Sequence, residues 1–169
     1  TAIEDFVIND LSTWYIRRSR SRVGISSTDF QDRAYFYSTL HHILAELAKL
    51  LAPFMPFIAE EIYTNLTAEQ SVHLANYPAS AKKLINRKLE EEMSITRQLV
   101  EKAHAARKEA RVKVRQPLSS LTIAAPIKIS KAVSLLIQDE INVKQLHQKI
   151  GKNLSVKLVT TITPTLRAE

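Results

Sequence analysis

The 169-residue sequence contains no cysteine, which excludes disulfides, cysteine nucleophiles and thiolate metal sites. It has only two glycines, and because Gly24 and Gly151 lie far apart, no glycine-rich phosphate-binding loop is present. No apolar run reaches the roughly 18 residues of a membrane-spanning helix. The N-terminus also lacks the basic region and cleavage site of a signal peptide. These absences favour a protein of a reducing, cytoplasmic compartment with no membrane partner.

Positive charge is present in excess. The chain has 24 Lys and Arg against 17 Asp and Glu, a net charge of +7. A basic surface of this kind indicates a polyanionic partner, most often a nucleic acid. Hydrophobic residues make up 45% and charged residues 24%, which is close to the globular average and excludes extended disorder.

Helical spacing of apolar residues dominates the first two thirds of the chain. It predicts helices over residues 1–23, about 28–66 and about 84–113, with a connecting loop at 67–82. Gly24 is a stop signal for the first of these helices. The scarcity of glycine also favours long helices over many tight β-turns.

Two features refine the second helix. Ser27 or Thr28 is expected to cap its N-terminus, since a hydroxyl can accept a hydrogen bond from the first turn. Pro53 and Pro56 interrupt its pattern. Because proline lacks the amide donor and clashes with the preceding turn, the helix is expected to kink or break there.

Composition changes after Pro117, where β-prone segments appear. We expect strands at residues 121–125, 143–147 and 155–162, and a helix at about 130–142. The predicted fold is therefore mainly α: a helical bundle over residues 1–116, followed by a small α/β subdomain over residues 117–169.

No group of residues has the spacing of a catalytic or metal site. No two of the five histidines are four residues apart as a helical metal pair requires. The carboxylates of residues 90–92 fit a solvated helix start, where they complement the helix dipole. Glu60 and Glu61 are adjacent in a helix and point about 100° apart, which disfavours an acid–base couple. We expect no catalytic, cofactor or metal residue in this chain.

Four arginines follow an aromatic pair within the first helix. Guanidinium groups bind phosphate bidentately, and a neighbouring aromatic ring can stack on an unpaired base. The alternative for the arginines is pairing with acidic residues such as Asp10 or with carboxylates of neighbouring helices. The alternative for Trp14 is a core position, because it continues the apolar stripe of Val7 and Leu11. The candidate RNA contacts here are Trp14, Arg17, Arg18, Arg20 and Arg22.

A second basic stretch lies on the third predicted helix. Residues 97–115 contain seven Lys or Arg against two Glu. A polar stripe with Glu101 and His104 runs along this helix at spacings of four and three residues, and its basic members are the candidate contacts Arg97, Lys108, Arg111 and Arg115.

Several segments carry a resemblance to a known family. Residues 9–20 resemble the start of the anticodon-binding domain of isoleucyl-tRNA synthetases. Residues 51–63 resemble the Pro-Phe-Ile-x-Glu-Glu helix that isoleucyl, valyl and leucyl enzymes share. Residues 71–78 and 112–118 are similar to patterns of the isoleucyl enzymes and favour them. The resemblance covers nearly the whole chain in order.

This resemblance implies the anticodon-binding part of a longer class I aminoacyl-tRNA synthetase. The parent enzyme would ligate isoleucine to its tRNA with ATP and magnesium, and catalytic and editing domains of the same polypeptide would do the chemistry, in a monomer. Residues 128–132 resemble the Lys-Met-Ser-Lys-Ser loop but follow the anticodon domain, so we expect only a strand-to-helix junction with two exposed lysines. Two alternatives are the anticodon-binding domain of a valyl or leucyl enzyme and a helical protein-docking module.

Overall fold

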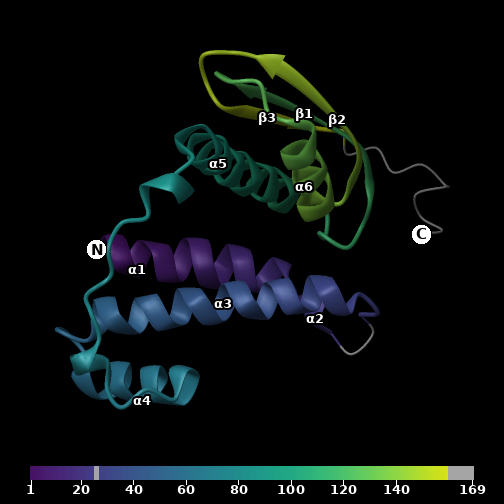
Figure 1. Ribbon diagram of the computed structural model, residues 1–169. Helices are drawn as coiled ribbons and strands as arrows, with labels where there is room; N and C mark the ends of the chain where they lie inside the picture. Colours follow the sequence, from purple (N-terminus) through teal and green to yellow (C-terminus); the bar gives the residue numbers. More distant parts are fainter. Residues whose placement is uncertain (25–26, 160–169) are drawn as a thin grey trace. The chain divides into compact units, whose positions relative to one another are not determined.

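The chain consists of two compact units, residues 1–80 and residues 81–169, in a computed structural model that describes residues 1–24 and 27–159 (Figure 1). The first unit is helical, and the second combines two helices with a three-stranded sheet. This confirms the predicted mainly α fold with a small α/β part. In the described residues, no helix has the length and apolar composition that crossing a membrane requires.

The first unit begins with a capped helix. The Thr1 hydroxyl accepts a hydrogen bond from the Glu4 amide, and the Glu4 carboxylate accepts one from the Thr1 amino group. Together these form a capping box, which satisfies donors that a helix start leaves unpaired. The elements are α1 (Ala2–Asp5), the π-helix η1 (Phe6–Ile16) that continues it, α2 (Arg20–Val23), α3 (Phe30–Leu51), α4 (Pro56–Thr67) and the short 3₁₀ helix η2 (Val72–Leu74).

The predicted break in the second helix is confirmed. α3 ends at Leu51, and α4 starts with Pro56 in its first turn, where proline costs no hydrogen bond. The predicted stop at Gly24 is also confirmed, because Gly24 follows α2 in an extended conformation. The predicted cap of α3 was wrong: the Asp29 side chain, not Ser27 or Thr28, accepts the bond from the Asp32 amide.

Small side chains hold α3 and α4 together. Ala48, Ala52 and Ala59 are buried in one cluster with Tyr63 and Val72, so the two helix backbones can approach closely. Glu60 fastens the following loop, since its carboxylate accepts bonds from the hydroxyl of Ser71 at 3.0 Å and from the amide of Val72 at 2.8 Å. Glu60 therefore has a structural role.

The second unit is a helix-backed sheet. It contains η3 (Lys82–Leu84), α5 (Arg87–Glu109), β1 (Leu118–Ala125), α6 (Lys131–Ile141), β2 (Val143–Ile150) and β3 (Ser155–Leu158). The strand order is β2-β1-β3, with β1 and β2 parallel and β3 antiparallel to β1. α5 and α6 pack against the same face of this sheet (Figure 1). The core between them is fully buried and includes Leu99, Leu121, Ile123, Ile137 and Ile141.

The division between the units lies earlier than the composition change at Pro117. It falls between Ser80 and Ala81, so α5 belongs with the sheet rather than with the first helices. The reason is the buried face of α5: Leu99, Val100 and Ala103 are at most 5% exposed, and this helix packs on β3 and α6. The domain boundary predicted at Pro117 coincides with the start of the first strand, and it stays a prediction.

The N-terminal part of α5 corrects one expectation. Glu92 is not a solvated member of an acidic helix start, because it is only 7% exposed and its carboxylate accepts a hydrogen bond from the amide of Ser130. Ser130 itself caps α6 through its hydroxyl, and Lys128 and Lys131 on either side are exposed. The predicted strand-to-helix junction is therefore confirmed, and a carboxylate from α5 fixes it.

The aromatic residues are divided unequally between the units. All five Phe, all five Tyr and the single Trp lie between residues 6 and 77, hence in the first unit. Tyr15 and Phe36 stack there with ring centroids 5.5 Å apart. The buried apolar side chains of the second unit are all aliphatic, and Glu92, Thr96 and Arg107 are buried beside them.

Candidate nucleic-acid interface

The arginine cluster of the first unit lies where the first long helix ends. η1 stops at Ile16, Ser19 is buried, and α2 starts at Arg20. Arg17 is exposed, and its Nε donates a hydrogen bond to the carbonyl of Thr13 at 2.8 Å. Arg20 is also exposed. These two side chains are the members of the cluster that solvent reaches most openly.

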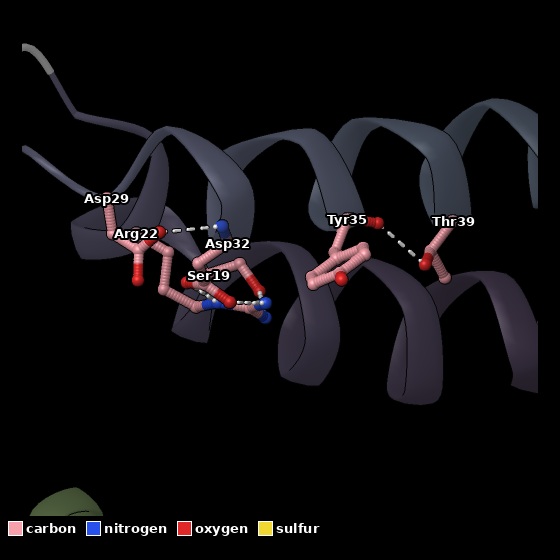
Figure 2. Close-up of polar contacts among 6 residues, drawn as sticks. All are labelled: Ser19, Arg22, Asp29, Asp32, Tyr35 and Thr39. Carbon is pink, nitrogen blue, oxygen red and sulfur yellow. Dashed lines mark hydrogen bonds and ion pairs between the residues drawn. The ribbon is translucent and has the colours of Figure 1, made fainter.

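Arg22 faces the neighbouring helix instead (Figure 2). Its Nε donates to Oδ2 of Asp32 at 2.7 Å and its Nη2 donates to Oδ1 at 2.5 Å, a bidentate pair. A third bond joins Nη1 to the Ser19 hydroxyl at 3.3 Å. The hydrogen bonds to Asp32 raise the pKa of Arg22, and the same bonds lower the pKa of Asp32. For Arg22, the alternative that it pairs with a carboxylate of a neighbouring helix is confirmed.

The Asp32 carboxylate is presented by the first turn of α3. Asp29 caps that turn by accepting the Asp32 amide at 2.9 Å, which orients the residue toward α2 (Figure 2). Arg33 secures the same connection, since its Nη2 donates to the carbonyls of Gly24 at 3.3 Å and Ser27 at 2.7 Å. Neither Asp32 nor Arg33 was among the residues predicted to be functional. They hold the arginine cluster in place.

Trp14 is neither a core residue nor fully exposed. Its ring is half-buried, and the guanidinium carbon of Arg18 lies 5.4 Å from the ring centroid. A cation over an aromatic face is attracted by the ring quadrupole. The pair keeps one face of the indole occupied and holds the charge of Arg18 close to it.

The second basic stretch, residues 97–115, is only partly helical. α5 ends at Glu109, so of the four predicted contacts only Arg97, half-buried, and Lys108, exposed, are on the helix. The middle of the stripe faces α6, because His104 Nε2 lies 3.6 Å from Oε1 of Glu140. Arg111 and Arg115 follow in the connection to β1, and both are exposed.

A turn places Arg111. Its φ of 55° is in the left-handed region. The amide of Arg111 bonds to the carbonyl of Lys108 and the amide of Val112 to that of Arg107, the paired pattern that closes a helix C-terminus. Glycine usually occupies such a position, so Arg111 carries a backbone strain of about 1 kcal/mol.

Arg107 fixes the connection that follows. It is 1% exposed, and its Nη2 donates to the carbonyls of Lys113, Val114 and Gln116, the first two at 2.9 Å. Burial lowers its pKa. Arg107 was not among the predicted contacts and is one of the seven Lys or Arg of residues 97–115. Its spacing of four residues from Ala103, and of eight from Leu99, was the signal that placed it on the buried face.

Asn142 completes this clamp. It follows α6 with a φ of 54°, and its side-chain amide donates to the carbonyls of Val114 and Arg115 at 3.1 Å each. Five acceptor contacts thus draw the carbonyls of residues 113–116 toward Arg107 and Asn142. The side chains of Lys113, Val114 and Arg115 remain exposed.

The predicted contacts therefore form two groups in separate units. Trp14 and the arginines of residues 17–22 lie in the first unit, and the contacts of residues 97–115 lie in the second. Throughout residues 1–24 and 27–159, no three side chains of His, Asp or Glu come together as a metal site requires.

Comparison with known proteins identifies relatives of this chain. Residues 1–123 match the family model described as the anticodon-binding domain of tRNA ligase. The chain is 39% identical over 171 aligned residues to an isoleucine–tRNA ligase of Clostridium tetani, which covers 98% of the chain and 16% of that protein. It is 42% identical over 154 residues to the isoleucine–tRNA ligase of Chlamydia trachomatis, covering 86% of the chain and 15% of the relative. An isoleucine–tRNA ligase of the archaeon Pyrococcus abyssi is 39% identical over 165 residues, covering 92% of the chain and 15% of the relative. The chain thus spans about one sixth of the length of these relatives.

Proposed function

The chain belongs to the family of anticodon-binding domains of tRNA ligases, and on this premise we propose that it binds the anticodon stem and loop of an isoleucine-accepting tRNA. The observation that carries the proposal is the agreement of relatives from two bacteria and an archaeon, all named isoleucine–tRNA ligases, at 39–42% identity. Their agreement favours the isoleucyl enzymes over valyl or leucyl ones. It also favours tRNA binding over a protein-docking module.

The basic residues supply the attraction. Most contacts between a protein and a nucleic acid go to phosphate and sugar, and they fix position and orientation. Arg17 and Arg20 are exposed at the end of the first long helix, while the Arg22–Asp32 pair keeps α2 against α3. In this proposal Arg17 and Arg20 contact phosphates, and Arg22 positions them.

In this proposal Trp14 and Arg18 contact bases rather than phosphates. RNA loops are recognised through unstacked bases that lie on aromatic rings or guanidinium planes. The stacked pair of Trp14 and Arg18 offers such a surface at the level of the arginine cluster. Arg97, Lys108, Arg111 and Arg115 provide a second set of phosphate contacts from the other unit.

The chemistry would belong to other domains of a longer polypeptide. ATP-dependent ligation of isoleucine and editing of mischarged tRNA are proposed for a parent enzyme, with ATP and magnesium bound there. We further propose that the parent acts as a monomer in the cytoplasm.

Salt-dependent binding tests the proposal. The variant Arg17→Ala/Arg20→Ala is compared with the unchanged chain by filter binding to isoleucine tRNA over a salt series. Each neutralised phosphate contributes about 0.7 to the slope of log affinity against log salt in a single strand, so losing two contacts should flatten it by about 1.4. Lys82→Ala/Lys83→Ala removes the same charge from exposed residues outside both groups and is the matched control.

Two outcomes of this binding experiment would contradict the proposal. Equal slopes for the arginine variant and the lysine control, with circular dichroism unchanged, would exclude the cluster as a phosphate contact. A parent chain that binds isoleucine tRNA no better than an unrelated tRNA would refute the proposed anticodon recognition itself.

A further inference from the structure

The sheet of the second unit has one face that neither α5 nor α6 covers. Along β1, Leu121, Ile123 and Ala125 are buried toward the helices, and Ser120, Thr122 and Ala124, which alternate with them, are half-buried on the opposite face. Side chains of neighbouring strands in register point to the same face of a sheet. The pairing therefore identifies every side chain that shares the face of Ser120, Thr122 and Ala124.

From Ser120 to Ala124, every partner of this face on β2 and β3 is basic or polar, whereas the pair Leu118 and Val143 at the start of the strands is apolar and buried. Thr122 lies between His147 of β2 and Lys157 of β3, and Ala124 lies between Lys149 and Ser155. Gln145 pairs with Ser120. Gln145 and the four flanking residues from β2 and β3 are all exposed.

No negatively charged residue occurs in the three strands, and the one ring in them is the imidazole of His147. Residues 118–125, 143–150 and 155–158 contain neither Asp nor Glu, and neither Phe, Tyr nor Trp. A solvated surface of a protein carries both signs of charge interspersed. A face with lysines at both edges and no carboxylate is complementary to a polyanion.

From this face we infer a second RNA contact surface, built from Gln145, His147, Lys149, Ser155 and Lys157 around the small side chains of β1, that holds the sugar–phosphate backbone. No Phe, Tyr or Trp is available on this face for the base stacking by which other RNA-binding sheets read unpaired bases, and His147 is the one ring among the five residues. Ammonium, imidazole, hydroxyl and amide groups all bond to phosphate oxygens or to the 2′-hydroxyl. The partner is thus the backbone of the same tRNA, bound without regard to base sequence.

The spacing of the cations fits this ligand. Lys149 and Lys157 stand on strands separated by β1, which are roughly 10 Å apart at about 4.8 Å per strand, and their partners Ala124 and Thr122 are two residues apart along β1, so the two backbones are about 12 Å apart. The side chains of Ser120 and Thr122 are short and leave the centre of the face open to a backbone. Long flexible lysines at both edges can then close on phosphates from two sides.

The inference rests on the proposed tRNA function but is tested separately. The variant Lys149→Gln/Lys157→Gln of the 169-residue chain is titrated with isoleucine tRNA and with an unrelated tRNA between 50 and 200 mM salt. Lys102→Gln/Lys131→Gln, which removes the same charge from exposed residues of α5 and α6, is the matched control. With a slope contribution of about 0.7–0.9 per phosphate, losing two contacts should flatten the slope by roughly 1.4–1.8 for both tRNAs.

Over that fourfold change in salt, the parent should lose about seven- to twelve-fold more affinity than the sheet variant. Equal behaviour of the sheet variant and its control would overturn the inference, as would a parent chain that binds neither tRNA. A parent that shows no preference for isoleucine tRNA, while the sheet variant still flattens both slopes, would refute only the proposed anticodon recognition. Lys149→Arg/Lys157→Arg keeps the charge and should keep the parent slope. If it flattens the slope like the glutamine variant, the effect belongs to the fold and the inference fails.

Discussion

Replacing Arg107 by methionine removes the donor that holds the connection between α5 and β1. Methionine has a similar length and suits a buried position, so the change deletes the charge and the hydrogen bonds with little change in volume. Nη2 of Arg107 serves three carbonyls but carries only two N–H bonds, so the contacts amount to two full hydrogen bonds.

The magnitude follows from this count. A hydrogen bond to a charged group contributes about 1.5–3 kcal/mol, so two contribute about 3–6 kcal/mol. Removing the buried charge also removes its desolvation cost, which offsets part of the loss. We expect Arg107→Met to lower the free energy of unfolding of the second unit by about 2–4 kcal/mol.

Amide hydrogen exchange of residues 113–118 is the direct assay, since it reports opening of this connection. Exchange should become faster in Arg107→Met. Lys108→Met, the exposed neighbour, should leave stability within about 0.5 kcal/mol of the parent. An Arg107→Met protein as stable as Lys108→Met, with unchanged exchange, would show that the clamp contributes nothing and refute the reasoning.

Three further predictions use single substitutions. The pKa of Asp32 is lowered by its hydrogen bonds from Arg22, so the stabilisation from this pair is present above the ordinary carboxyl pKa of about 3.9 and is lost as the pH falls through the lower folded value. The stability difference between the parent and Asp32→Asn, measured by urea unfolding over a pH series, should therefore shrink as the pH falls below the ordinary carboxyl pKa, and a difference that grew over that range would contradict it. Arg111→Gly should raise the unfolding free energy by about 0.4–1 kcal/mol, because glycine adopts the left-handed conformation without strain; thermal denaturation followed by circular dichroism checks this, and a lowered midpoint would be the contrary result. Trp14→Ala should weaken tRNA binding by about 1–3 kcal/mol in a filter-binding salt series while leaving the salt slope unchanged, as expected for a stacking ring rather than a charge; a flattened slope would assign it an electrostatic role.

The sequence predicted the helices and strands well because apolar periodicity and proline determine them locally. Pro53 and Pro56 placed the break between α3 and α4. The alternation after residue 155 placed β3, which ends at Leu158, and residues 160–162 of the predicted strand lie outside the described residues. The end of α5 was predicted four residues too late, because Arg111 adopts the left-handed turn without the glycine that ordinarily marks it.

The orientation of individual charged side chains was less predictable. Arg22 and its partner Asp32 are ten residues apart on different helices, so only the packing of α2 on α3 brings them together. Glu92 and Ser130 are separated by 38 positions in the same way. From local composition such residues are predicted to be solvated surface charges. In the folded chain they form hydrogen bonds to residues distant in the sequence.

Because every Phe, Tyr and Trp lies in the first unit, the two units can be followed by different spectroscopic signals. Tryptophan and tyrosine fluorescence arises wholly from residues 14–77, so a fluorescence titration with RNA reports on the first unit, which contains the arginine cluster, and receives no signal from the sheet. Histidine is the one ring that the second unit has, at His104 and His147. Their imidazole proton resonances would follow the α5–α6 contact and the open face of the sheet as two separate signals, so one sample can report on both units without an added label.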